Sequence, residues 1–405
     1  MAPHPDTLKV VGSWLEDHGV LTSSISTSHG GGWLTVTGVP VSKANDLLGA
    51  SYQLYRHAGT NETILRTVGY ALPSVLHMHI QTVAPTTFFG TPGTLRQTPR
   101  VQRSRVGATL INREEPFVQP AILRRLYNTW GYRPRAISRN KLGITGFHGE
   151  YASFEDLIQF MKQFRSDTEN PTFTFVEINS HGYNPNDPGT EANTDMQYAQ
   201  AIAYPTPHVF YSIGGAPPPF IPDSYQPENN NEPFLDWLNY MANVEHPPQT
   251  ISTSYGGNEQ TFPPDYAKSI CDLLARLGAR GVSLIFASGN TGVGGADCKK
   301  NDGSGVVEFQ PIFPSTCMFS FFFPLKNSTQ IPVSHHSDMY FAGPYVTSVG
   351  GTTSRPEVAA HFSSGGFSNI FERPKYQAEV VPKFFQGLGD AHSGLYKCAL
   401  YRDWI

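Results

Sequence analysis

From about residue 120 onward, segments typical of buried strands alternate with amphipathic helical segments, and this alternation constrains the fold more than any other feature. Strands are predicted at 142–146, 172–178, 208–213, 249–254 and 282–288, and helices at 154–164, 191–203, 232–242 and 266–277. Parallel strands need long, usually helical, crossover connections. The sequence therefore predicts an α/β fold, a parallel sheet with helices on both faces. Ligands of such sheets bind beyond the carboxyl ends of the strands.

The residues before this region divide into two parts. Residues 1–88 predict a small α+β domain, with helices at 8–19 and 42–48 (the second capped by Ser42) and strands at 33–40, 52–57 and 64–70. Residues 89–116 contain several arginines together with structure-breaking glycines and prolines. We interpret this segment as a basic linker, either simply solvated or exposed for proteolytic processing. The α/β region then covers residues 117–405.

Composition excludes several classes of protein. The net charge of −4 over 405 residues is not that of a basic nucleic-acid binder, so no nucleic-acid partner is expected. No apolar run approaches the roughly 20 residues of a membrane span, so no membrane partner is expected. The first residues have neither the basic nor the apolar part of a signal peptide. Four cysteines, Cys271, Cys298, Cys317 and Cys398, permit disulfides or buried thiols.

Two carboxylates at the start of the predicted helix 191–203 are candidates for acid–base chemistry. Glu191 and Asp195 are four residues apart and share one helix face, with Thr190 as the predicted N-cap. Two close carboxylates repel, so one tends to keep its proton and can support the other as a general base. The alternative is structural, because acidic residues in a first turn also interact favourably with the helix dipole.

Two further segments lie at predicted strand ends. The strand that ends near 288 runs into a glycine-rich turn, where the Asn290 amide could donate to an oxyanion. Ser254, Tyr255 and Gly256 follow another strand, and their backbone could pair with an extended peptide. Taken alone, the first segment is also compatible with an ordinary glycine-rich turn, and the second is better explained as an ordinary exit from a strand into a loop. No cluster with the spacing of metal ligands is present, so no metal-binding residue is predicted.

Taken together and in order, these motifs resemble the sedolisin (serine-carboxyl peptidase) family, particularly its fungal tripeptidyl-peptidase-like members. The resemblance is carried by 123–128, 189–198, 210–215, 231–239, 252–257 and 346–353, with 1–88 similar to the propeptide of the family. It implies a subtilisin-like fold, secretion, peptide or protein substrates, and a propeptide that covers the cleft until the linker is cut. A monomer is expected.

The resemblance also implies roles for individual residues. Glu191 matches the general base that takes the proton of a serine, and Asp195 matches the carboxylate that orients this base. Asn290 stands where the family usually has an oxyanion-hole aspartate. Ser254, Tyr255 and Gly256 match a substrate-binding strand. An amide donates a hydrogen bond at any pH, whereas a carboxyl group donates only when it is protonated. Asn290 is therefore expected to relax the acid dependence of this step.

The sequence departs from the family in its downstream elements. The nucleophilic serine motif matches no segment of this sequence, and Ser354 belongs to a different family segment. Calcium is expected from the family, but its ligands are not expected among these residues. The chain is therefore read as incomplete at both ends and catalytically inactive as given. The prediction is a tripeptidyl-peptidase or acid endopeptidase by family, and the alternative is a non-catalytic protein that binds peptides or acts as an inhibitor.

Residues 318–343 interrupt the match within the peptidase region. The family continues from the equivalent of Cys317 directly to that of Pro344. The codons at both ends of this segment can carry splice signals, and cutting there removes 26 codons in frame. We hypothesise a retained intron, with a true surface insertion as the alternative.

Overall fold

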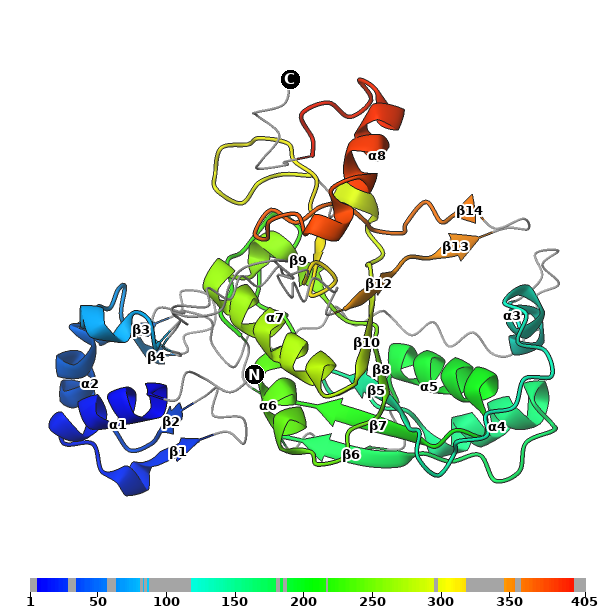
Figure 1. The fold of residues 1–405 in the computed structure, drawn as a ribbon, viewed down its shortest axis with the longest axis horizontal. Coiled ribbons are helices and arrows are strands. Elements are labelled where there is room, and N and C mark those ends of the chain that lie inside the picture. Colours follow the sequence, from blue (N-terminus) through cyan, green and yellow to red (C-terminus); the bar gives the residue numbers. More distant parts are fainter. Residues whose placement is uncertain are drawn as a thin grey trace, which may run out of the picture. The chain divides into compact units, whose positions relative to one another are not determined.

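The chain is described by a computed structural model, drawn in Figure 1. The described residues are 6–27, 34–56, 63–80, 83, 86, 118–179, 183–184, 188–215, 218–294, 298–317, 346–353 and 358–396. The predicted linker 89–116, the segment 318–343 and Ser354 lie outside the described residues. Two compact units are formed, the first from Met1–Phe220, Glu228–Tyr255 and Ala279–Val282, and the second from Ile221–Pro227, Gly256–Gly278 and Ser283–Ile405.

The N-terminal domain has the α+β character that its sequence predicts. Its helices are α1 (Thr7–Asp17) and α2 (Val41–Leu48), and its strands are β1 (Ile25–Thr27), β2 (Leu34–Val36), β3 (Gln53–Arg56) and β4 (Thr63–Arg66). β1 pairs antiparallel with β2, and β3 with β4. The core contains Val11, Leu15, Val20, Leu47, Leu48 and Leu76. Ser42 was expected to cap the second helix, but Pro40 holds the N-cap position and Ser42 lies in the first turn.

A six-stranded sheet confirms the predicted α/β fold. Its strands are β5 (Leu142–Gly146), β6 (Thr174–Ile178), β7 (His208–Ile213), β8 (Thr250–Thr253), β10 (Ser283–Ala287) and β12 (Thr347–Val349). The order across the sheet is β12-β10-β8-β5-β7-β6. In the first unit β5 pairs parallel with both β7 and β8, and β6 with β7; in the second unit β10 pairs parallel with β12.

Helices cover both faces of the sheet within the first unit. Ile144 of β5 and Phe210 of β7 are in one core cluster with side chains of α4 (Phe154–Phe164) and α5 (Thr190–Ala203). Neighbouring residues of a strand point to opposite faces. Accordingly Tyr211 faces away from this cluster and contacts Tyr240 of α6 (Phe234–Asn243), with ring centroids 6.3 Å apart. A further helix, α3 (Pro120–Leu126), precedes β5.

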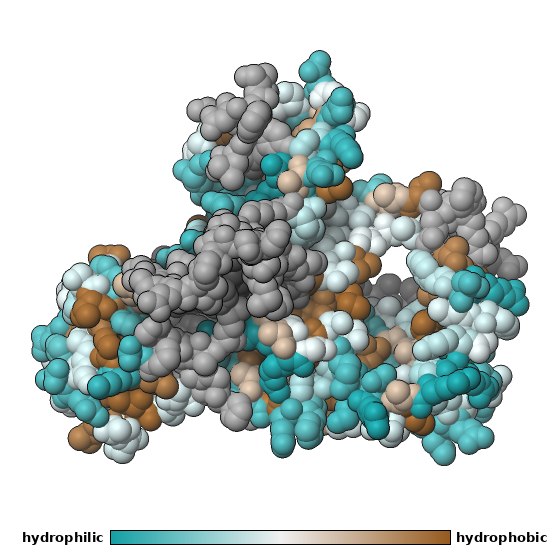
Figure 2. All heavy atoms as spheres, in the orientation of Figure 1, coloured by the Kyte–Doolittle hydropathy of each residue, from teal (hydrophilic) through white to brown (hydrophobic). Residues whose placement is uncertain are grey.

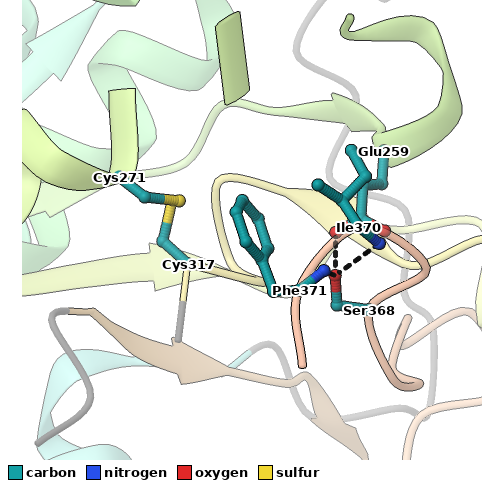
Figure 3. The surroundings of a disulfide bond; sticks show 6 residues. All are labelled: Glu259, Cys271, Cys317, Ser368, Ile370 and Phe371. Atoms are coloured by element: carbon teal, nitrogen blue, oxygen red, sulfur yellow. Dashed lines mark hydrogen bonds between the residues drawn. A yellow bond between two sulfur atoms is a disulfide. The ribbon is translucent and has the colours of Figure 1, made fainter. Parts of the chain in front are cut away.

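The second unit contains a disulfide. Its main helix is α7 (Pro264–Ala279), followed by β10 and, late in the chain, α8 (Val380–Leu388). Cys271 of α7 is bonded to Cys317, as Figure 3 shows, so at least one of the cysteine pairs permitted by the sequence forms.

The short strands are β9 (Gly257–Asn258), β11 (Ile312–Phe313), β13 (Thr352–Thr353) and β14 (Val358–Ala359). The 3-10 helices of the chain are η1 (Thr22–Ser24), η2 (Ser74–Leu76), η4 (Glu259–Thr261), η5 (Gly292–Gly294) and η6 (Lys375–Gln377).

A buried carboxylate anchors a turn near the disulfide. Glu259 is fully buried and accepts hydrogen bonds from Ser368 Oγ and from the backbone N–H of Asn369, each at 2.6 Å. Figure 3 shows Ser368 in turn accepting from the backbone N–H groups of Ile370 and Phe371. Burial raises the pKa of Glu259, while these donors lower it. The carboxylate therefore joins two parts of the second unit that are about a hundred residues apart.

The surface carries hydrophobic residues among polar ones. Exposed examples in the N-terminal domain are Leu21, Leu54, Val68, Val75 and Met78, and Figure 2 shows brown, hydrophobic atoms scattered over this domain. Among the helices that the structure describes, none has both the length and the apolar character that a membrane span requires.

Candidate active site

The first turn of α5 positions the two predicted carboxylates. Gly189, not Thr190 as predicted from the sequence, is the N-cap, and Thr190 is the first helical residue. The backbone N–H of Gly189 donates to the carbonyl of Tyr151 at 3.1 Å, which ties the start of the helix to the loop after β5. Glu191 and Asp195 then project from the same helix face, as their spacing predicts.

Ser254, which directly follows β8, brings the predicted strand segment to these carboxylates. Its hydroxyl interacts with Glu191 and with Asp195, and this interaction lowers the pKa of each carboxyl group. Burial has the larger effect on Asp195, and together with the neighbouring carboxylates it raises the pKa to about 7. The pKa of Glu191 is also raised, by burial first and then by a neighbouring negative charge. The structure thus places Glu191, Asp195 and Ser254 in one cluster.

A third carboxylate, which the sequence analysis did not single out, completes this cluster. Glu150 Oε2 accepts a hydrogen bond from the Tyr255 hydroxyl at 3.2 Å and from the backbone N–H of Ala192 at 3.3 Å. Its charge raises the pKa of both Glu191 and Asp195. One feature of the sequence could have identified Glu150 as a site residue. It lies four residues after the predicted strand 142–146, at the sheet edge where ligands bind.

Gly189 permits the close approach of Glu150 to the helix. A Cβ atom at position 189 would lie 2.5 Å from Glu150 Cβ and 2.6 Å from Glu150 Oε2. Distances this short do not occur between real side chains, so only glycine fits here without displacing the carboxylate. The hydroxyl proton of Tyr255 is held firmly, because burial and the three nearby carboxylates raise the pKa of the phenol well above its usual value.

The protonation of this cluster follows from its electrostatics. Below pH 7 Asp195 retains its proton, because its pKa is raised to about 7. Its Oδ2 atom is buried and has no hydrogen-bond partner among the residues that the structure describes. A protonated carboxyl group can donate to a neighbouring ionised one, whereas two ionised groups repel. The arrangement therefore suits one charged and one neutral carboxyl group, a base supported by an acid.

Asn290 lies in the second unit, in the turn after β10, and its side chain is exposed. Ser364 holds this turn on both sides. Its backbone N–H donates to the carbonyl of Gly289 at 3.0 Å, and its Oγ accepts from the backbone N–H of Thr291 at 3.0 Å. Gly289 has a φ of +102°, a backbone conformation that favours glycine. The position of Asn290 is thus fixed within its unit, and its role stays a prediction.

Gly256, the last of the predicted substrate-binding residues, also belongs to the second unit and is exposed. A Cβ atom there would lie 2.5 Å from the carbonyl oxygen of Phe313. The absence of a side chain therefore lets two backbone segments of this unit approach closely. Its role in substrate binding stays a prediction.

Calcium is expected from the family resemblance. In the described part of the chain, no three His, Cys, Asp or Glu side chains are arranged to hold a metal ion. We therefore assign none of these residues to a calcium site.

Comparison with known proteins shows what this chain is similar to. The family described as "Pro-kumamolisin, activation domain" matches residues 1–89. Relatives 33–35% identical in sequence cover most of the chain. These similarities support membership of the chain in the sedolisin family of serine-carboxyl peptidases. One of these relatives is the tripeptidyl-peptidase SED2 of Arthroderma otae, 34% identical over 98% of this chain and 64% of its own length.

Other relatives are also named tripeptidyl-peptidases, and the chain covers each of them only in part. The tripeptidyl-peptidase SED4 of Arthroderma otae is 35% identical over 92% of this chain and 58% of its own length. The probable tripeptidyl-peptidase SED3 of Arthroderma benhamiae is 33% identical over 98% of this chain and 63% of its own length. The chain thus spans less than two thirds of the length of these relatives. A solved Pseudomonas sedolisin aligns with a TM-score of 0.41 at 16% identity, over 66% of this chain and 67% of its own.

Proposed function

We propose that this chain is the propeptide and the peptide-binding, proton-transferring part of a secreted, monomeric tripeptidyl-peptidase. The observation that carries the proposal is the cluster of Glu150, Glu191 and Asp195 around Ser254 and Tyr255 at the carboxyl ends of the parallel strands. The names of the relatives favour release of tripeptides over internal cleavage. Peptide substrates and the propeptide of the chain itself are the partners that this function implies.

The reaction is acyl transfer, and each residue has a defined part in it. A serine hydroxyl attacks the peptide carbonyl while Glu191 takes its proton, and the neutral Asp195 stabilises Glu191 through a hydrogen bond. The oxyanion donor that the family resemblance assigns is the amide of Asn290. The leaving amine takes the proton from Glu191, and water then hydrolyses the acyl-enzyme by the same steps in reverse.

On the family resemblance, no segment of this sequence matches the motif of the nucleophilic serine. We therefore propose that this polypeptide binds peptides without cleaving them. The second candidate function is a non-catalytic protein that binds peptides or acts as an inhibitor. The two functions differ in what they predict for a longer form of the protein, because only the peptidase requires that such a form cleave peptides.

The test measures binding and cleavage with the same peptides. Fluorescence anisotropy of a labelled hexapeptide should report saturable binding at acidic pH, weakened by Tyr255→Leu and unchanged by Tyr225→Leu, whose side chain is exposed. Release of aminocoumarin from a tripeptide conjugate should be undetectable. Absence of saturable binding, or equal effects of the two substitutions, would contradict the proposal. Rapid coumarin release would show that the nucleophile is present after all.

A further inference from the structure

A fourth acidic residue lies beside the carboxylate cluster and lacks a full set of hydrogen bonds. Glu232 directly precedes Pro233, the N-cap of α6, and is 6% exposed. Its Oε1 atom lies 3.7 Å from Nε2 of His148. Its Oε2 atom is buried and has no hydrogen-bond partner among the described residues. Half of this carboxylate is therefore unsatisfied.

His148 connects Glu232 to the candidate active site. The centroid of the His148 ring lies 6.5 Å from that of the Tyr255 ring, and the Tyr255 hydroxyl donates to Glu150. His148 follows β5 at the carboxyl edge of the sheet, and its φ of +58° is uncommon for a residue other than glycine. About a quarter of the His148 side chain is exposed, whereas the Glu232 side chain is 8% exposed, so His148 is the member of the pair that reaches solvent. A chain of contacts thus runs from Glu232 through His148 and Tyr255 to Glu150.

His148 alone does not satisfy Glu232. A separation of 3.7 Å is longer than a hydrogen bond, and the imidazole carries charge only when it is protonated. A buried carboxylate oxygen without a donor is costly to maintain, so such groups in native proteins call for an explanation. A ligand ammonium or guanidinium group would bring both N–H donors and the opposite charge.

We propose that Glu232, with His148 beside it, is a subsite that receives a positively charged group of the bound peptide. This inference rests on the proposed function, because it assumes that the site binds peptides. The charged group has two possible sources, the α-ammonium group at the peptide N-terminus and a lysine or arginine side chain. Both have the same chemistry at the carboxylate, and the experiment distinguishes them.

The experiment compares peptides that differ in one charge. Binding of an apolar hexapeptide is measured by calorimetry with a free and with an acetylated N-terminus. The acetylated peptide is then compared with versions that carry lysine or its neutral isostere norleucine at each position in turn. The wild-type protein should bind the peptide with the relevant charge about tenfold more tightly than its neutral counterpart. Loss of affinity on acetylation identifies the α-ammonium group, and a gain with lysine identifies a side chain.

Substitution assigns the effect to Glu232. Glu232→Gln keeps the shape of the side chain and should remove the preference for the charged peptide while leaving binding of the neutral peptide unchanged. The matched control is Glu245→Gln, whose side chain is 88% exposed and which should keep the full preference. If Glu232→Gln does not fold, as judged by circular dichroism, the wild-type protein still tests the proposal. Equal affinity for charged and neutral peptides would overturn the subsite.

The outcomes separate the two proposals. Equal affinity of the wild-type protein for charged and neutral peptides would overturn the Glu232 subsite and leave the proposed function intact. A charge preference that survives Glu232→Gln would also overturn the subsite. Failure of every peptide to bind would refute the proposed function, and the subsite with it.

Discussion

The raised pKa of Asp195 makes the stability of the fold depend on pH in a direction that can be measured. The pKa rises from its ordinary 3.8 to about 7, because burial disfavours the charged form. Each tenfold change in proton affinity is worth about 1.4 kcal/mol, so ionised Asp195 costs the folded state up to about 4 kcal/mol. Because the pKa of Asp195 is raised in the folded state, its contribution to stability is fully present below pH 4, where Asp195 is protonated. The contribution of this protonated group is lost as the pH rises through 7.

Asp195→Asn tests this reasoning, because an amide has nearly the shape of a protonated carboxyl group and cannot ionise. Urea unfolding of both proteins is measured at pH 4, 6 and 8. At pH 4 the two free energies of unfolding should agree within about 1 kcal/mol. At pH 8 the variant should be more stable than the wild type, by up to about 4 kcal/mol.

The comparison of the two proteins at each pH cancels the titration of groups that they share. Asp265→Asn is the control, because its side chain is 73% exposed and the substitution should leave the pH profile unchanged. Parallel profiles for the wild type and Asp195→Asn would refute the reasoning. They would mean that Asp195 is solvated or that a donor stabilises its charged form.

Three further predictions concern the disulfide, a close backbone approach and the oxyanion position. Replacing Cys271 and Cys317 together by serine should lower the free energy of unfolding by about 4 kcal/mol, because the disulfide no longer restricts a loop of 46 residues in the unfolded chain. The melting temperature of this variant should no longer change when a reductant is added. Gly189→Ala should destabilise the fold by about 1–3 kcal/mol in chemical unfolding, because its Cβ would collide with the third carboxylate, whereas Gly278→Ala in α7 has open space and should be neutral or stabilising. In a catalytically competent form of the enzyme, Asn290→Asp should confine kcat to more acidic pH; identical pH–rate profiles would contradict this.

Much of the fold could be predicted because its elements have strong local patterns. The strands 142–146 and 208–213 and the helix 154–164 were predicted with the bounds that the structure gives them. Errors fall at helix starts, since backbone hydrogen bonds to a distant loop decide that Gly189 is the N-cap. The short strand β1 was missed, because three residues carry too little periodicity to identify a strand.

The candidate site could be predicted only where its members are close in sequence. Glu191 and Asp195 share a helix face, and that spacing is visible in the sequence. Glu150 and Glu232 are single acids in loops, and only tertiary packing brings Glu150 to Tyr255 and Glu232 to His148. Their local sequence contains no periodic signal, so proximity to a strand end was the only available indication.

The central position of β5 has a consequence for the synthesis of the chain. Leu142 pairs with His208 on one side and with Thr250 on the other, and the second partner is 108 residues further along the chain. At a translation rate of roughly 5–20 residues per second, β5 waits about 5–20 seconds for its second neighbour. During that interval an apolar strand has one unpaired edge, a condition that favours association with other chains. The nascent protein is therefore expected to depend on chaperones more than the finished fold does.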